Sequence, residues 1–285
     1  IVIKALVCSK IIYPSMLLHV PDRVISEVNR LLYNFIWKKK DRIARRSLIG
    51  KYEDGGLNMI DLESKFAAMK VGWVSRIVKN MDMNWTCGLT HYLNRLNMNV
   101  FDFLKMSFRT KLQFPLLDKI SPFYKDVILY FNNVKIKKQI NLMSDSEIFG
   151  ETLWGNELVQ SKNVTLFIDT WVKSNIRYIK DLFDDQGNFL TLQQTKEKLV
   201  CTKNYICEYK FIKHHAKIFT NKVDNRVAPF VQTIGHKYCI INNKRIDLES
   251  IHSKMVYSVF IDKKKQKPAS ISYWARRFDI LKSDV

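Results

Sequence analysis

Two pairs of adjacent carboxylates come closest to a catalytic motif in this sequence. Adjacent aspartates such as Asp184-Asp185 can hold two divalent metal ions that clamp the attacking and leaving oxygens of a displacement. This pair, however, runs directly into Gln-Gly-Asn, residue types that favour turns. The second pair, Glu53-Asp54, immediately precedes two glycines. We therefore predict a turn at each pair and no metal site.

Cysteine and histidine also give no strong site. The chain has five cysteines, none of them in a C-x-x-C pair, which favours a reducing compartment without a disulfide framework. Cys201 and Cys207 precede His214-His215, but the spacing lacks the tight cysteine pair of a structural zinc site. Because the histidines lie in a basic stretch, we expect an exposed, partly protonated pair. No phosphate-binding glycine loop, dinucleotide fingerprint or H-E-x-x-H motif occurs.

The net charge indicates a polyanionic partner. The 285 residues carry a formal charge of +20 at pH 7, and the 47% hydrophobic content is ample for a folded core. Nucleic acid is the first candidate partner and an anionic membrane surface the second. The opening twenty residues are apolar but interrupted by Lys4, Lys10 and Pro14, so we expect no membrane span.

The positive charge is concentrated in two stretches. Residues 38–51 hold seven basic side chains against one acid: Lys38, Lys39, Lys40, Arg42, Arg45, Arg46 and Lys51. We predict that these residues bind phosphates, with Trp37 and Tyr52 beside them as possible stacking partners for a base or ribose. Packing in the core is the alternative role for Trp37. A second basic contact is predicted at Lys263, Lys264, Lys265 and Lys267, with a solvated helix end as the alternative.

Helices must position these residues. A helix over 22–37 carries an apolar face formed by Val24, Val28, Leu31, Leu32 and Phe35. Asp61 is the expected N-cap of a helix striped by Phe66, Met69, Trp73 and Ile77. Further elements are expected as a helix from Ser121-Pro122, a strand at 164–168, a helix from Thr191, a hairpin at 238–246 turning at Asn242-Asn243, and helices at 250–262 and 271–282. The fold class is therefore mainly α with minor β (α+β).

Three blocks of sequence resemble non-LTR (LINE-type) retrotransposon reverse transcriptases. The first, residues 35–73, is similar to the segment that follows the polymerase palm in that family, with Ile60 where the family often has proline. Its matching residues are Phe35, Ile36, Trp37, Arg42, Ile43, Gly55, Gly56, Asp61, Lys70 and Trp73. The second, residues 153–199, matches at Trp154, Trp171, Lys173, Ile176, Ile179, Asp181, Leu182, Gly187, Asn188, Phe189 and Leu190. The third, residues 253–274, matches at Ser253, Lys254, Tyr257, Lys267, Pro268 and Trp274.

The resemblance implies an organisation in three regions. Residues 1–80 are expected to form a thumb-like helical bundle, 81–150 a helical connector, and 151–285 a C-terminal linker region with helices and a small hairpin. The chain starts with Ile1 rather than Met, so we expect a piece truncated at both ends. The palm, with its aromatic-x-Asp-Asp motif and Mg²⁺, is then expected upstream of Ile1, and the family's Cys/His cluster after Val285.

The resemblance also implies a function. We expect a non-catalytic, cofactor-free fragment of an RNA-directed DNA polymerase that positions template RNA and the primer duplex (RNA/DNA or DNA). Its partners would be these nucleic acids and the palm and fingers of the parent polypeptide. It would be intracellular, as a ribonucleoprotein of the nucleus and cytoplasm, and it would not bind a membrane.

Two other functions stay open. The first is a degenerate nuclease or RNase H-like domain, which needs carboxylates converging on a metal; Asp169, Asp181, Asp184 and Asp185 are the candidates. The second is an architectural role, in which the helices only pack against the rest of the parent polypeptide.

Overall fold

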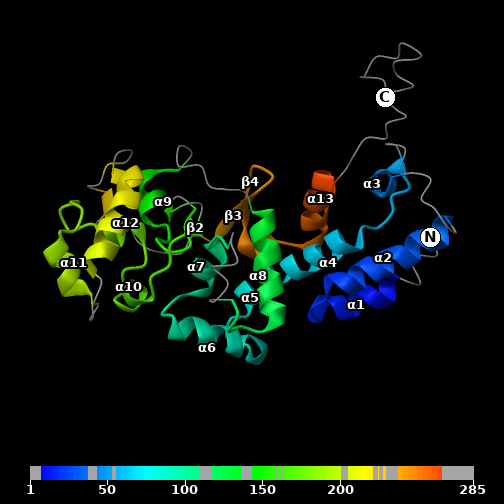
Figure 1. Ribbon diagram of the computed structural model, residues 1–285, viewed down its shortest axis with the longest axis horizontal. Coiled ribbons are helices and arrows are strands. Elements are labelled where there is room, and N and C mark those ends of the chain that lie inside the picture. Colours follow the sequence, from blue (N-terminus) through cyan, green and yellow to red (C-terminus); the bar gives the residue numbers. More distant parts are fainter. Residues whose placement is uncertain are drawn as a thin grey trace, which may run out of the picture. The chain divides into compact units, whose positions relative to one another are not determined.

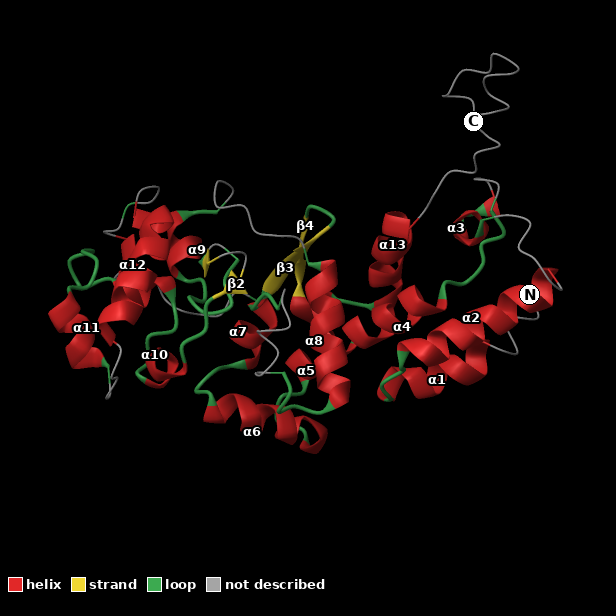
Figure 2. Ribbon diagram, viewed as in Figure 1, coloured by secondary structure: helices red, strands yellow, loops and turns green. Residues whose placement is uncertain are grey.

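Over the residues that the structure describes, the chain is mainly helical with two small β-sheets (Figures 1 and 2), so the predicted fold class is confirmed. The computed structural model describes residues 8–37, 44–52, 56–108, 117–135, 143–157, 159–161, 164–199, 205–220, 224, 227–228 and 237–264. It divides into two compact units. The terminal unit comprises Ile1–Trp73 with Ile251–Val285, and the central unit comprises Val74–Ser250.

These units follow a different division from the three predicted regions. Residues 81–150 and 151–250 belong to one compact unit, and the segment from Ile251 onward joins the first 73 residues. The reason lies in α13 (Ser253–Lys264), which packs along α4 (Leu62–Val71) far away in the sequence. No local sequence pattern predicts that α13 packs against α4.

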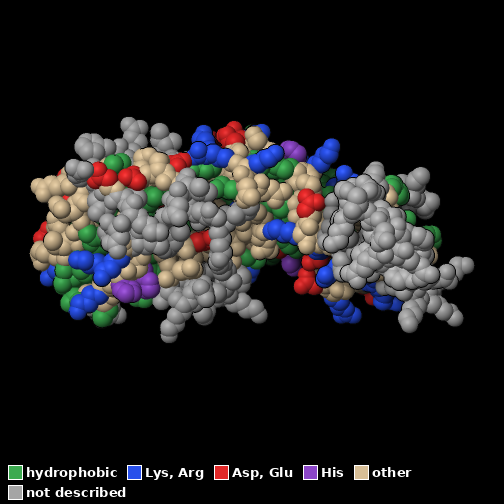
Figure 3. Space-filling model, turned by 90° about the horizontal axis from the view of Figure 1, so that it is seen from above, with side chains coloured by type: hydrophobic (Ala, Val, Ile, Leu, Met, Phe, Trp, Pro, Cys, Tyr) green, Lys and Arg blue, Asp and Glu red, His purple; other side chains and the backbone are tan. Residues whose placement is uncertain are grey.

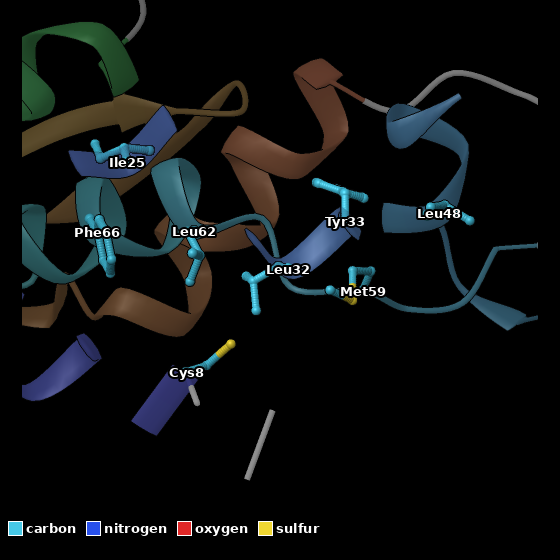
Figure 4. Close-up of a cluster of buried hydrophobic side chains, with 8 residues drawn as sticks. All are labelled: Cys8, Ile25, Leu32, Tyr33, Leu48, Met59, Leu62 and Phe66. Carbon is cyan, nitrogen blue, oxygen red and sulfur yellow. The ribbon is translucent and has the colours of Figure 1, made fainter. Parts of the chain in front are cut away.

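The terminal unit is built around one cluster of buried side chains. It contains α1 (Ser9–Leu17), α2 (Asp22–Trp37), α3 (Arg45–Ile49), α4 and α13. Figure 4 shows the cluster, whose members are Cys8, Ile25, Leu32, Tyr33, Leu48, Met59, Leu62 and Phe66. These side chains come from α2, α3, α4, the loop before α4 and Cys8 at the start of α1, so the cluster joins all of these segments.

The helix predicted over 22–37 is confirmed as α2, but its buried face differs from the predicted one. Leu32 is buried and Val28 partly buried, whereas Val24, Leu31 and Phe35 are 45%, 54% and 68% exposed. Ile25 takes part in the core instead. The apolar residues of α2 cover a wider arc of the helix than the core contacts. Val24, Leu31 and Phe35 lie on the part of this arc that the core does not contact.

Helix α4 begins as predicted, with Asp61 as its N-cap. The carboxylate of Asp61 accepts a hydrogen bond from the backbone amide of Ser64 at 3.1 Å. The amide of Asp61 donates to the hydroxyl of Tyr257 on α13 at 3.2 Å. The predicted stripe continues past Val71 in a separate helix, because α4 ends at Gly72 and α5 (Trp73–Lys79) follows.

The central unit contains the remaining elements. After α5 the helices are η3 (Asn84–Thr86), α6 (Cys87–Arg95), α7 (Val100–Lys105), α8 (Pro122–Val134), α9 (Asp145–Phe149), α10 (Asp169–Lys173), η6 (Ile179–Leu182), α11 (Leu192–Lys198), α12 (Tyr205–Thr220) and η8 (Leu248–Ser250). The strands are β1 (Gln160–Ser161), β2 (Val164–Thr165), β3 (Tyr238–Ile241) and β4 (Lys244–Asp247).

Local signals explain where several of these helices start. Helix α8 has Pro122 in its first turn, as predicted, and buries Tyr124, Val127, Ile128 and Phe131. Helix α11 starts in a capping box between Thr191 and Gln194, also as predicted. The capping box of α11 satisfies amide groups that have no partner within the helix. In α8 the side chain of Ser121 makes no cap hydrogen bond, so the proline alone marks the start of that helix.

The two sheets match the predictions to different degrees. In β3 and β4, Tyr238 pairs with Asp247 and Ile241 with Lys244, around a turn at Asn242-Asn243. Both asparagines have positive φ, 50° and 59°, which confirms the predicted hairpin. The strand predicted over 164–168 is shorter, because only Val164–Thr165 pairs with Gln160–Ser161. The helix predicted at 271–282 lies outside the described residues.

A salt bridge fastens the β3–β4 hairpin to α9. Glu147 accepts hydrogen bonds from the backbone amide of Ser144 at 3.1 Å, from the hydroxyl of Tyr238 at 2.9 Å and from the guanidinium of Arg245. The guanidinium also lies 3.5 Å from the centre of the Tyr238 ring. Burial opposes the charge on Glu147, but these hydrogen bonds outweigh it and lower the pKa to about 2.

The low pKa of Glu147 predicts acid sensitivity. A group whose pKa is lower in the folded than in the unfolded state stabilises the fold above pH 4.5, and this contribution is lost as the pH falls toward 2. We expect Glu147→Gln to lower the free energy of unfolding by about 2 kcal/mol at pH 7. This value is smaller than the pKa shift alone implies, because solvent screens the exposed Arg245. Urea unfolding at pH 7 and pH 2.5 (about 2 units below the unfolded pKa) should show this cost shrinking. A cost independent of pH would contradict the prediction.

Candidate nucleic-acid interface

Helix α3 presents charge on one side and an apolar anchor on the other. Arg45 and Arg46 at its start are exposed, whereas Ser47, Leu48 and Ile49 are buried. Leu48 belongs to the core cluster of the terminal unit. The backbone that carries the two arginines is therefore fixed to the core, and their charges face solvent.

The loop after α3 is held by close backbone pairing. The amides of Leu57 and Met59 both donate to the carbonyl of Leu48, at 3.1 and 2.9 Å. The amide of Asn58 donates to the carbonyl of Gly50 at 2.7 Å, and that of Gly56 to the carbonyl of Lys51 at 2.8 Å. We call residues 45–59 the basic loop; its described part runs over 45–52 and 56–59.

The structure places four of the nine predicted contact residues on this loop. Arg45, Arg46, Lys51 and Tyr52 are exposed, and Tyr52 is 67% exposed. The guanidinium of Arg45 lies 4.3 Å from the centre of the Tyr33 ring of α2, a cation–π contact that orients it. Lys38, Lys39, Lys40 and Arg42 lie outside the described residues. Trp37 is the last residue of α2, and its predicted stacking role stays a prediction.

In the second basic stretch, Lys264 forms an ion pair. The ammonium of Lys264 lies 2.8 Å from a carboxylate oxygen of Asp61 and 2.6 Å from one of Glu63. Partial burial opposes the charge of Lys264, but the two hydrogen bonds outweigh it and raise its pKa. This ion pair ties the end of α13 to the start of α4. Lys263 is exposed, and Lys265 and Lys267 lie outside the described residues.

The candidate carboxylates have separate local partners. Asp184 accepts hydrogen bonds from the amides of Asn188 at 2.8 Å and Gln186 at 2.9 Å, which lower its pKa and form the predicted turn. Asp181 accepts from the amides of Arg177 and Tyr178, both at 2.8 Å. Asp169 pairs with Lys173 at 2.5 Å. Within the described part of the chain, no three Asp, Glu, His or Cys side chains gather as metal ligands would.

The His214-His215 pair lies on α12, among other basic residues. His214 is exposed, while burial and the neighbouring His214 lower the pKa of the partly buried His215. Cys207 on the same helix is an exposed free thiol, and Cys201 lies outside the described residues. No binding role is predicted for this helix from the sequence, although its lysines at positions 210, 213 and 217 are visible there.

Known proteins give no further guide to this interface. No family model matches the sequence, no curated protein matches it, and no solved structure matches the fold. Among the described residues, no helix is both long enough and apolar enough to cross a membrane.

Proposed function

We propose that this chain binds RNA and RNA/DNA or DNA duplex as a non-catalytic part of a retrotransposon reverse transcriptase. In this role it holds the template and primer in register, while a palm elsewhere in the parent polypeptide supplies the two-metal chemistry. The observation that carries the proposal is the basic loop, which combines exposed Arg45, Arg46, Lys51 and Tyr52 on an anchored backbone. The resemblance of the three sequence blocks supplies the parent family.

Physical chemistry suits this loop to phosphates rather than to a particular base sequence. Arginine and lysine on a fixed backbone neutralise phosphates and release counterions, which makes affinity dependent on salt. The exposed ring of Tyr52 adds a surface on which a base or ribose can stack. The formal charge of +20 supports long-range attraction of a polyanion.

The salt dependence of binding tests the proposal. Changing Arg46 and Lys51 together to alanine removes two exposed charges from the loop. We expect the slope of log K against log salt to fall by about 1.8 for duplex and about 1.4 for single-stranded RNA. Fluorescence anisotropy with labelled RNA and hybrid, from low to high salt, measures both slopes.

The matched control removes the same amount of charge from another part of the terminal unit. Lys10→Ala with Arg23→Ala removes two exposed positive charges from α1 and α2. This control should lower the slope by less than half as much as the loop variant. Equal slopes in the loop variant and the unchanged chain would overturn the assignment of the loop.

An architectural role is the second candidate, and α2 favours it. The exposed side chains of Val24, Leu31 and Phe35 form an apolar stripe on this helix. Such a stripe suits packing against another part of a longer polypeptide. Weak RNA binding that does not respond to salt would support this function over the first.

A further inference from the structure

Helix α12 turns a basic face to solvent. We define this face by its exposed residues Lys210, Phe211, Lys213, His214 and Lys217. At 3.6 residues per turn these positions cover roughly half of the helix circumference. The other half is buried through Tyr209, Ile212, Ala216 and Phe219. The face is therefore a fixed surface of the central unit.

Basic residues outnumber acidic ones on α12. Glu208 is the one acidic residue of α12, and it accepts a hydrogen bond from the indole nitrogen of buried Trp171 at 2.7 Å. The neighbouring α11 adds exposed Lys196 and Lys198. Its own Glu197 accepts a hydrogen bond from Gln193 at 2.8 Å. In Figure 3, Lys, Arg and His side chains gather over the end of the view where Figure 1 places α11 and α12.

An aromatic side chain lies within the same face. Phe211 is 39% exposed, and its ring packs edge-on against His215, with the ring centres 4.5 Å apart. Lys213 lies at the opposite edge of the face, where its ammonium donates to the hydroxyl of Tyr209 at 3.2 Å and lies 5.6 Å from the centre of the Phe189 ring. Lysines on the same face as a partly exposed aromatic ring suit a single strand, with ammonium groups on phosphates and the ring against a base.

The spacing of the lysines suits a nucleic-acid backbone. From Lys210 to Lys217 the helix rises by about 10 Å. The two ammonium groups can therefore contact different phosphates of one bound strand. We propose that the α12 face is a second nucleic-acid contact, and that it binds single-stranded RNA. This inference rests on the proposed function, because it takes RNA as the ligand of this chain.

Removing charge from the face tests the phosphate contacts. In the full chain, Lys210→Ala with Lys217→Ala should lower the salt-dependence slope for an oligouridylate of about 16 nucleotides by about 1.4. The affinity at low salt should fall about ten-fold. Lys79→Ala with Lys244→Ala is the matched control, since both lysines are exposed in the same unit. A slope that changes equally in the two variants would overturn the proposal.

Removing the ring tests the preference for single strands. Phe211→Leu keeps an apolar contact with His215 but removes the aromatic surface. We expect it to weaken oligouridylate binding about five-fold or more while leaving a blunt RNA duplex of the same length unaffected. Equal losses for both probes would overturn the single-strand assignment. Circular dichroism of each variant checks that the helix is retained.

Two further outcomes separate this inference from the proposed function. Loss of affinity in the Arg46/Lys51 variant but not in the Lys210/Lys217 variant would overturn the α12 contact alone. An absence of RNA binding by the unchanged chain would overturn both. Binding of phosphatidylserine vesicles that depends on Lys210 and Lys217, without any effect of these residues on oligouridylate, would assign the face to a membrane surface instead.

Discussion

Replacing Trp154 by alanine is expected to lower the free energy of unfolding of the central unit by about 3–5 kcal/mol. Trp154 is only 1% exposed, so its removal leaves a cavity the size of an indole. Its ring centre lies 6.3 Å from that of Trp171, edge to face, and 6.4 Å from that of Phe167. The indole nitrogen donates to the carbonyl of Ile176 at 2.7 Å. The alanine variant would lose all of these interactions together.

Urea unfolding followed by tryptophan fluorescence and circular dichroism measures this loss. Trp154→Phe keeps most of the buried ring but not the hydrogen bond, so it should cost about 1–2 kcal/mol beyond the reduced ring size. Trp85→Ala is the surface control, because Trp85 is 41% exposed. We expect it to cost about 1 kcal/mol or less. Equal costs for Trp154→Ala and Trp85→Ala would contradict this account of the core.

Local sequence signals predicted much of the fold. Asp61 and Thr191 each cap the start of a helix, and Pro122 lies in the first turn of another, because such signals depend on residues only a few positions apart. The Asn242-Asn243 turn is equally local, since asparagine tolerates positive φ. These features require no knowledge of the rest of the chain.

Features that depend on distant partners could not be predicted in this way. Apolar periodicity identified α2, but which part of its wide apolar arc is buried depends on α1 and α4. The pairing of Lys264 with Asp61 joins residues 203 positions apart, and no local pattern indicates it. For the same reason the sequence suggested three regions in order, whereas the last described helix returns to the first unit.

For the candidate interface, too, the sequence predicted the local feature but not the one that depends on the fold. Composition identified the basic residues of 38–51, because charge is visible in any stretch of sequence. Composition does not reveal that Leu48 and Ile49 anchor the loop while Arg45 and Arg46 are exposed. On α12, exposure rather than charge count distinguishes Lys210 and Lys217 from the buried side of the helix.

Gly56→Ala is the second substitution with a large expected effect, because two backbone segments of the basic loop meet at this glycine. A Cβ atom on residue 56 would lie 2.1 Å from the carbonyl oxygen and 2.4 Å from the carbonyl carbon of Gly50. Backbone atoms cannot turn away as the end of a side chain can, so the segments must separate. Separation disrupts the hydrogen bonds that Gly50 and Lys51 accept from Asn58 and Gly56. We expect a loss of about 3 kcal/mol in the free energy of unfolding of the terminal unit.

Gly56→Ala should also weaken RNA binding if the basic loop is the interface, because the anchor that fixes Arg45, Arg46 and Lys51 is then released. Gly88→Ala is the matched control, since a Cβ on Gly88 of α6 meets nothing within 4 Å. At such a helical site alanine is expected to stabilise by about 0.4–1 kcal/mol. Urea unfolding and RNA anisotropy on both variants separate the two effects. Unchanged stability in Gly56→Ala would show that the loop is not closed as described. Lost stability with unchanged RNA affinity would instead remove the loop from the interface, because a displaced backbone cannot leave three fixed phosphate contacts intact.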